Sequence, residues 1–247
     1  MSKRIALVTG GIGGIGSSIC QQLAKDDHTV VANYIAAEAD KAKSWLAAQR
    51  AAGYNVHIAE VDVSSFESCA TMAAKIKADV GAVDILVNNA GITKDGTFKK
   101  MPLENWVAVI NVNLNSVFNV SKQFIDDMLG KGWGRVINIS SINGQKGQFG
   151  QTNYSAAKAG MHGFTKALAQ ETAAKGITVN TISPGYIGTE MVMAVKEEIR
   201  NQIIAQIPVG RLGKPEEIAR LVSYLASDDA AFITGANIAI NGGQHMC

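Results

Sequence analysis

The sequence predicts one α/β domain in which a doubly wound parallel sheet carries helices on both faces. Three observations predict it. Short, fully apolar runs such as residues 5–8 are typical of strands buried on both sides. Such runs alternate with helical patterns along the chain, without internal repeats or a linker. The chain has 247 residues, 47% of them hydrophobic, which suits one large domain of this class, and we assign residues 1–247 to it.

Composition and charge exclude several classes of function. The formal net charge of +2 is too small to favour nucleic-acid binding. There is no run of 18 apolar residues to span a membrane, and the N-terminus enters a strand at once, which leaves no room for a signal peptide. Cys20, Cys69 and Cys247 have no paired spacing, so we expect free thiols in a reducing, cytoplasmic compartment. The histidines lack metal-ligand spacing, so no metal site is expected.

The first strand is followed by a glycine-rich loop and then by a helical pattern. Residues 9–16 read Thr-Gly-Gly-Ile-Gly-Gly-Ile-Gly, and apolar residues recur at Ile19, Cys20 and Leu23. Strand, glycine loop and helix in this order are the context of a dinucleotide site. Glycines let the backbone approach a pyrophosphate, and the helix N-terminus offers free N–H groups. We therefore expect a Rossmann-type cofactor site with contacts from Gly10, Gly13, Gly14, Ile15 and Gly16.

The second strand, residues 29–33, ends where NAD-binding units usually carry a carboxylate. Asn33 stands there instead, and the missing carboxylate removes a repulsion against a 2′-phosphate. Lys41, on a helix expected over residues 38–52, is a nearby candidate cation for that phosphate, although a solvated surface lysine would show the same pattern. The sequence therefore favours NADP, with Asn33 and Lys41 among its contacts.

The third and fourth strands both end in polar residues. The third, residues 56–61, is closed by Asp62 and Val63, and this aspartate could accept a hydrogen bond from an adenine amino group or cap the helix expected over residues 65–80. The fourth, residues 84–88, runs into an Asn-Asn-Ala-Gly turn. Open α/β sheets bind ligands at the carboxyl ends of their strands. The expected cofactor contacts here are Asp62, Val63, Asn89, Ala90 and Gly91.

The second half of the chain continues the alternation. A long helix is expected over residues 102–130, with Asn111 and Asn113 in its interior, where propensity disfavours asparagine. Strands follow at residues 134–139, 177–182 and 238–240. The amphipathic stretch 189–206 is interpreted as part of a substrate lid over about residues 186–210, although ordinary packing would give the same pattern.

The main chemical pattern surrounds a tyrosine at the start of a helix over residues 154–170. Ser141 follows the fifth strand, Tyr154 comes later in the chain, and Lys158 stands about one helical turn beyond it. A nearby ammonium favours the phenolate, so we expect Lys158 to lower the pKa of Tyr154 from its usual value of about 10 toward neutrality. Ser141 could donate a hydrogen bond to a substrate oxygen as charge develops there. This set suits carbonyl reduction, in which carbon receives a hydride and oxygen receives a proton.

Together these motifs resemble the short-chain dehydrogenase/reductase family over nearly the whole chain. The resemblance implies that Tyr154 is the general acid, and that Lys158 lowers its pKa and holds the nicotinamide ribose. It implies that Ser141 orients the substrate carbonyl, and that Asn113, rather than Asn111, holds a water in the proton path. It also adds Pro184, Gly185 and Ile187 to the cofactor contacts. The motifs, in order, are Thr9-Gly10-x-x-x-Gly14-x-Gly16, Asp62, Asn88-Asn89-Ala90-Gly91, Asn113, Ser141, Tyr154-x-x-x-Lys158 and Pro184-Gly185.

A narrower resemblance is to the acetoacetyl-CoA reductases of polyhydroxyalkanoate synthesis, carried by residues 91–95, 143–154, 183–186 and 241–246. It implies NADPH-dependent reduction of acetoacetyl-CoA, a 3-oxoacyl-CoA, to (R)-3-hydroxybutyryl-CoA for polyhydroxybutyrate synthesis. The arginine that this group usually has near the adenosine phosphate is not evident after Asn33. The substrate contacts implied by position are Asp95, Ser141, Gln148, Phe149, Gly150, Gln151, Tyr154, Gly185 and Tyr186.

Two other functions share part of this pattern. A 3-oxoacyl-[acyl-carrier-protein] reductase would carry the same catalytic motifs, and basic residues such as Lys99 and Lys131 would suit either anionic carrier. A protein that senses NADPH without turnover would need no proton donor, so the intact set of Ser141, Tyr154 and Lys158 argues against it. Members of the family are commonly tetramers, which implies a homotetramer whose small-molecule partner is an acyl-CoA.

Overall fold

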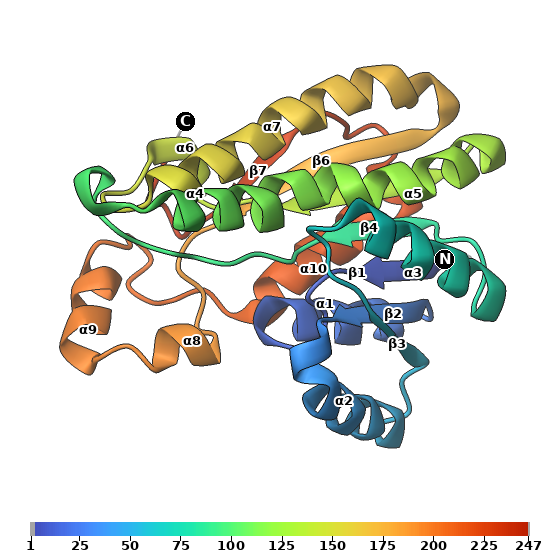
Figure 1. The fold of residues 1–247 in the computed structure, drawn as a ribbon, viewed down its shortest axis with the longest axis horizontal. Coiled ribbons are helices and arrows are strands. Elements are labelled where there is room, and N and C mark those ends of the chain that lie inside the picture. The colour runs from blue at the N-terminus through green and yellow to red at the C-terminus, as the bar shows by residue number, and fades with distance from the viewer. Residues whose placement is uncertain (1–2, 247) are drawn as a thin grey trace.

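The computed structural model describes residues 3–246 and contains one seven-stranded parallel sheet (Figure 1). The strand order is β3-β2-β1-β4-β5-β6-β7. This architecture confirms the predicted fold class, and the expected strands agree with the observed ones to within two residues at their ends. The strands are β1 (Ile5–Val8), β2 (Thr29–Tyr34), β3 (Val56–Glu60), β4 (Ile85–Asn88), β5 (Gly134–Ile139), β6 (Ile177–Pro184) and β7 (Asn237–Ile240).

Helices cover both faces of the sheet, and each face has its own apolar core. Ile19 and Leu23 of α1 pack with Val222 and Leu225 of α10 on one face. Met72 of α3 and other apolar side chains of α5 and α7 pack on the opposite face. The helices of the first face are α1 (Gly14–Lys25), α2 (Ala39–Ala51) and α10 (Pro215–Ala226); those of the second are α3 (Phe66–Asp79), α5 (Ser116–Lys131) and α7 (Thr152–Thr172).

Helix α10 was not among the elements expected from the sequence. Its signals are nevertheless present, since Pro215 occupies the first turn and Ile218, Val222 and Leu225 recur on one face. The helix lies against α1, so the last part of the chain completes the core beside the glycine loop. Within residues 3–246 there are also the shorter α-helices α4 (Leu103–Ile110), α6 (Asn143–Lys146), α8 (Glu190–Met193) and α9 (Glu197–Ala205).

The long helix expected over residues 102–130 is interrupted in its middle. Helix α4 passes into α5 through a π-helical turn, Asn111–Asn115, and this widened turn directs the fully buried Asn113 toward the interior. Such turns are rare and often lie at functional sites. The unfavourable asparagines therefore mark a change in helix geometry.

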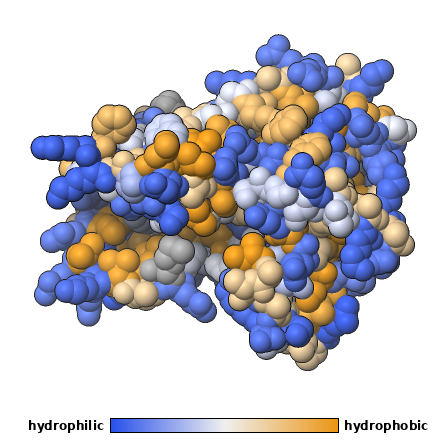
Figure 2. Space-filling model, viewed as in Figure 1, coloured by the Kyte–Doolittle hydropathy of each residue, from blue (hydrophilic) through white to orange (hydrophobic). Residues whose placement is uncertain are grey.

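The connections after β1 and β4 create the space for a ligand. These strands are neighbours, but α1 leaves toward one face of the sheet while α4 and α5 leave toward the other. A crevice opens at the carboxyl ends of strands where connections diverge in this way. Helices α8 and α9 stand apart from the sheet, at the lower left of Figure 1, and Figure 2 shows the surface hollowed beside them.

Candidate active site

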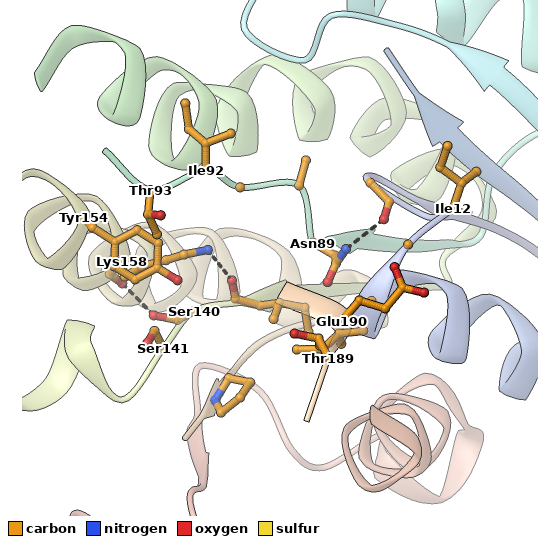
Figure 3. A pocket seen from close by; sticks show the side chains of 18 of the residues that line it. Ile12, Asn89, Ile92, Thr93, Ser140, Ser141, Tyr154, Lys158, Thr189 and Glu190 are labelled. Atoms are coloured by element: carbon orange, nitrogen blue, oxygen red, sulfur yellow. Dashed lines mark hydrogen bonds between the residues drawn. The ribbon is translucent and has the colours of Figure 1, made fainter. Parts of the chain in front are cut away.

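A cavity of about 480 Å³ lies at the carboxyl ends of β1, β4, β5 and β6 (Figure 3). The glycine loop and Ile12 line one end of it, and Ser141, Tyr154 and Lys158 meet at the other. The cavity therefore joins the two motifs that the sequence places far apart. The expected contacts that line it are Gly10, Gly13, Gly14, Ile15, Lys41, Asn89, Ala90, Gly91, Ser141, Tyr154, Lys158, Pro184 and Gly185.

The glycine loop forms a cradle that fits a pyrophosphate. Gly10 has a φ of +61°, in the left-handed region that favours glycine. A Cβ on Gly16 would collide with the carbonyl oxygen of Gly10 and lie 2.7 Å from Nδ2 of Asn89. Helix α1 begins at Gly14, and Gly13 supplies no side-chain cap, so its first N–H groups remain available to an anion. Gly16 itself is buried under the loop and shapes the cradle without lining it.

Asn33 lies beneath this cradle and does not line the cavity. Its Oδ1 accepts a hydrogen bond from the N–H of Gly10 at 3.0 Å, and its Nδ2 donates to the carbonyl of Val61 at 3.2 Å. The side chain is buried and ties the end of β2 to the glycine loop. Its observed contacts are therefore with the protein backbone.

Asp62 and Val63 also lie away from the cavity lining. The carboxylate of Asp62 accepts hydrogen bonds from the backbone N–H and the hydroxyl of Ser64, at 2.9 and 2.6 Å. Helix α3 is capped instead by Ser65, which accepts from the N–H of Ser68. Val63 is buried in the core. Asp62 thus stabilises the turn before the helix cap.

Lys41 stands at the rim of the cavity, in an ion pair with Glu38. Their Nζ and Oε1 atoms are 3.1 Å apart, and both side chains are more than a third exposed. A Cβ on Gly13 would lie 3.3 Å from Nζ of Lys41, so the ammonium sits directly over the glycine loop. An exposed pair of this kind contributes little to stability. Because the side chain of Lys41 is exposed at the rim, a ligand anion could reach its ammonium group.

Lys158 is fully buried beneath the catalytic end of the cavity. Its Nζ donates a 2.8 Å hydrogen bond to the carbonyl of Ile139, and it lies 5.6 Å from the ring centroid of Tyr154 (Figure 3). Burial lowers the pKa of Lys158 to about 8, because the ammonium loses its hydration.

Tyr154 does not show the lowered pKa that the sequence reasoning expected from Lys158. Burial raises the pKa of Tyr154 above its ordinary value, a hydrogen bond with Ser141 opposes that rise, and the charge of Asp95 adds to it. The ammonium of Lys158 is turned toward Ile139, so desolvation dominates the pKa of the tyrosine. The predicted proximity of Ser141, Tyr154 and Lys158 is present, but this electrostatic expectation was wrong for the geometry observed.

Asn113 lies below the cavity and joins the helical layer to the segment after β4. Its Oδ1 accepts from the N–H of Ile92 and its Nδ2 donates to the carbonyl of Ile92, both at 2.8 Å. Asn111 instead bonds to Asn115 on the exposed side of the helix. The structure therefore separates the two asparagines, and only Asn113 supports the cavity floor.

The residues expected at the substrate form a second group beside Tyr154. Gln151 donates to Asp95 at 2.9 Å and accepts from Asn143 at 2.9 Å, while the N–H of Gly96 donates to the carbonyl of Gly150 at 2.8 Å. These bonds tie the segment after β4 to the loop before α7. Phe149 is 87% exposed at the edge of this loop, next to Gln148, which accepts from Lys146.

Tyr186 and Ile187 line a smaller cavity of about 220 Å³, which shares Gly185 with the main one. Burial raises the pKa of Tyr186, and the charge of Asp95 contributes. The end of β6 and the turn after it thus separate the two spaces: Pro184 lines the cavity of Tyr154, Gly185 lines both, and Tyr186 and Ile187 line the smaller one.

Several lining residues were missed from the sequence. Thr189 and Glu190 reach the cavity from the start of α8, and Ser140 lies beside Ser141 after β5. In the sequence, Ser140 is marked only by its place beside Ser141, and Thr189 and Glu190 only by their place at the start of a helix. Neither feature reveals the direction of a side chain. The others are Ile12, Glu38, Ile92, Thr93 and Ile139.

Residues 3–246 contain no group of three or more His, Cys, Asp and Glu side chains able to hold a metal ion. Over the same range, no helix is long and apolar enough to cross a membrane. Cys20 and Cys69 are buried free thiols, and Cys247 lies outside the described residues.

Comparison with known proteins gives consistent matches. A family model described as Enoyl-(Acyl carrier protein) reductase matches residues 10–245. A protein named acetoacetyl-CoA reductase from Allochromatium vinosum is 60% identical over 243 residues, covering 98% of this chain and 99% of its own. Another of that name, from Cupriavidus necator, is 56% identical over 246 residues and 100% of both chains. A 3-oxoacyl-[acyl-carrier-protein] reductase from Pseudomonas aeruginosa is 44% identical over 247 residues, covering 100% of this chain and 99% of its own.

Proposed function

The chain belongs to the short-chain dehydrogenase/reductase family, and from that membership we propose that it reduces acetoacetyl-CoA to (R)-3-hydroxybutyryl-CoA with NADPH. The observation that carries the chemistry is the meeting of Ser141, Tyr154 and Lys158 in the same cavity as the glycine cradle. The substrate rests on the two relatives named acetoacetyl-CoA reductase, which match over nearly their full length at 60% and 56% identity.

The cavity suits a nicotinamide dinucleotide. The pyrophosphate would lie over Gly13 and Gly14 at the start of α1, and the nicotinamide ribose would lie beside Tyr154 and Lys158. A carboxylate at the end of β2 would disfavour a 2′-phosphate, and Asn33 supplies none. Lys41 stands over the glycine loop as the cation for that phosphate, which favours NADP.

The bound cofactor supplies the hydride, and the side chains of this chain supply the proton and the orientation. The hydroxyl of Tyr154 donates its proton to the 3-oxo oxygen of the substrate as negative charge develops there. Ser141 already shares a hydrogen bond with Tyr154, so its hydroxyl can hold the same oxygen. The ammonium of Lys158, 5.6 Å from the centre of the Tyr154 ring, would offset part of the desolvation cost of the tyrosinate that remains.

We place the approach of the acyl-CoA on the side of Asp95 and Gln151, whose hydrogen bond ties the segment after β4 to the loop before α7. The exposed ring of Phe149 offers an apolar surface to the carrier arm. We assign residues 186–210 as the lid of the site, because Thr189 and Glu190 line the cavity and α8 and α9 stand apart from the sheet. The product would supply polyhydroxybutyrate synthesis in the cytoplasm.

We also propose a homotetramer. A groove of about 400 Å³ between α5 and α7 is lined by apolar side chains that include Phe118, Leu129 and Phe164. Phe118 is 53% exposed, and Phe232 near β7 is fully exposed. Exposed apolar patches of this kind mark contacts between chains. A monomeric mass in analytical ultracentrifugation would contradict this assembly.

A steady-state assay tests the proposed reaction. Oxidation of NADPH is followed with acetoacetyl-CoA, with NADH and a 3-oxoacyl-[acyl-carrier-protein] run in parallel. We expect the highest kcat/KM with NADPH and the CoA thioester, and chiral analysis should find the (R) product. Faster turnover of the carrier-protein thioester would favour the alternative, a 3-oxoacyl-[acyl-carrier-protein] reductase, which is the name of the Pseudomonas aeruginosa relative. Tight NADPH binding without turnover of either thioester would contradict the reductase assignment.

A further inference from the structure

His162 lies on α7 one helical turn beyond Lys158, outside the cavity lining. Its side chain is half-buried and points toward the ends of two strands. Nε2 is 3.0 Å from the hydroxyl of Ser140, which follows β5, and 3.4 Å from the hydroxyl of Ser183 in β6. The imidazole thus bridges three elements directly behind the catalytic residues.

The direction of these hydrogen bonds follows from the protons available. The hydroxyl of Ser140 donates its single proton to the carbonyl of Lys158 at 2.8 Å. The hydroxyl of Ser183 donates its proton to Oδ1 of Asn237 at 2.7 Å. Both serine oxygens can therefore only accept from His162, because a hydroxyl has one hydrogen. Nε2 must carry a proton.

The ring is expected to be neutral, so Nε2–H defines one tautomer. Burial lowers the pKa of His162 below its ordinary value, and the positive charge of Lys166, one turn further along α7, lowers it more. The ring contacts Ser140, which follows β5, and Ser183 of β6, and Ser183 is bonded to Asn237 of β7; none of these three side chains carries a charge.

The bridge acts on the groups that the reaction uses. In an α-helix the carbonyl of Lys158 receives the backbone N–H of His162. The same carbonyl receives the hydroxyl of Ser140, and Nζ of Lys158 donates to the carbonyl of Ile139, next to Ser140 in the chain. Ser140 is itself fixed to β6, because its N–H donates to the carbonyl of Ile182 at 2.8 Å. The backbone N–H of His162 therefore holds the carbonyl of Lys158, and its ring holds Ser140, the residue before Ser141, against the same carbonyl.

We propose that His162 is a positioning residue of this reductase: its Nε2–H holds Ser140 on the Lys158 carbonyl and so fixes Lys158 and Ser141 relative to Tyr154. The inference rests on the proposed function for its effect on rate, whereas the hydrogen-bond geometry stands apart from it. His162 touches neither substrate nor cofactor in this arrangement. Its loss should change the rate of the chemical step and leave ligand affinity nearly unchanged.

The kinetic test compares His162→Leu with His162→Gln. Leucine removes the donor, and we expect kcat to fall about ten-fold, the rate equivalent of one hydrogen bond, with little change in KM for either substrate. Glutamine keeps an N–H donor near the Nε2 position and should restore most of the rate, which a role in packing alone would not explain. His57→Leu, which removes a histidine from β3 on the far edge of the sheet, is the matched control and should keep the wild-type kcat.

Combining His162→Leu with Ser140→Ala isolates the coupling. If the histidine acts through Ser140, the double variant should be no slower than the slower single variant. Multiplicative losses, or equal kcat in the leucine and glutamine variants, would overturn the inference. If the wild-type protein reduces neither thioester, the proposed function fails, and the arrangement is tested by ¹⁵N NMR of the histidine side chains. A neutral ring protonated at Nε2 supports it, and the Nδ1–H tautomer contradicts it.

Discussion

Asn113 and Ile92 exchange two hydrogen bonds of 2.8 Å, so one side chain satisfies both backbone polar groups of a residue in the segment after β4. The π-helical turn between α4 and α5 makes this possible, because the widened turn directs the fully buried carboxamide of Asn113 toward Ile92. Gly91 leaves the space for it, since a Cβ there would lie 2.7 Å from Oδ1 of Asn113. The two hydrogen bonds fix the position of Ile92, which lines the cavity.

Asn113→Ala should lower both stability and activity. The N–H and the carbonyl of Ile92 would both lose their partner, and leaving such partly buried groups unsatisfied costs about 1–2 kcal/mol in unfolding free energy. Denaturant unfolding measures this cost, and the steady-state assay should show a lower kcat. Asn115→Ala is the control, because Asn115 lies in the same turn but is exposed, and its side chain donates a hydrogen bond to the exposed side of the helix, at Asn111. Equal effects of the two substitutions would contradict a special role for Asn113.

Tyr154→Phe should remove the proton donor and little else. We expect kcat to fall by about 10²- to 10⁴-fold, the usual contribution of a positioned general acid. The phenyl ring keeps the apolar contacts, so NADPH affinity measured by fluorescence titration should stay close to that of the wild type. A variant with full activity would sink the proposed mechanism.

Lys158 should make the stability of the protein without added nucleotide rise with pH above about 8. Burial lowers the pKa of this lysine from 10.5 to about 8. Below pH 8 the folded and unfolded states both hold the proton, and the folded state bears the cost of burying the charge. Between pH 8 and 10 the unfolded chain binds more protons, so the unfolding free energy increases with pH through this group.

Lys158→Met should therefore be more stable than the wild type at pH 7, by roughly 1–3 kcal/mol, while losing activity. The gain should shrink as the pH rises from 8 to 10. Thiols and other tyrosines that titrate in this range are common to both proteins, so they cancel in the difference. Denaturant titrations at pH 7, 8, 9 and 10 make the comparison. Parallel stability curves for the two proteins would show that the lysine is not desolvated.

Lys41→Ala should weaken NADPH binding and leave NADH binding nearly unchanged. A charged hydrogen bond to the 2′-phosphate corresponds to a change of about ten-fold or more in KM for NADPH. Lys43→Ala is a matched control, because Lys43 forms a similar ion pair with Asp40 at 3.3 Å on the same helix but does not line the cavity. Parallel changes with both cofactors would show that Lys41 does not contact the phosphate.

Gly16→Ala should damage the cofactor cradle, because its Cβ would collide with the carbonyl of Gly10 and lie 2.7 Å from Nδ2 of Asn89. We expect a large loss of NADPH affinity in calorimetric titration. Gly163→Ala on α7 has open space around the new Cβ and should raise the unfolding free energy by up to about 1 kcal/mol. Similar affinity losses in both variants would point to an effect of helix composition instead.

The fold could be predicted largely from the sequence because its signals are local. Buried strands such as β1 and β4 are short and consist of apolar residues, apart from Asn88 at the end of β4, and the glycine loop marks where a strand passes into a helix. The same reasoning brought Tyr154 and Lys158 together, because helical spacing alone places them on one face.

The features of the site that the sequence could not predict depend on the direction and burial of side chains. Asn33 stands at the end of β2 as expected, but only the three-dimensional arrangement shows its carboxamide turned beneath the glycine loop. The pKa of Tyr154 depends on desolvation, which no residue spacing reveals. Thr189 and Glu190 reach the cavity through the path of a loop after β6, and that path has no periodic signal.

The packing of α10 on α1 has a consequence for how the chain is made. Ser223 donates a 2.6 Å hydrogen bond to Asp26 across 197 positions, and apolar side chains of both helices share one core. On the ribosome, α1 is synthesised early, whereas α10, which packs on it, emerges only near the end of translation. Until then Ile19 and Leu23 lack part of their apolar cover. The nascent chain should therefore acquire nucleotide affinity late, after residue 226 has left the exit tunnel.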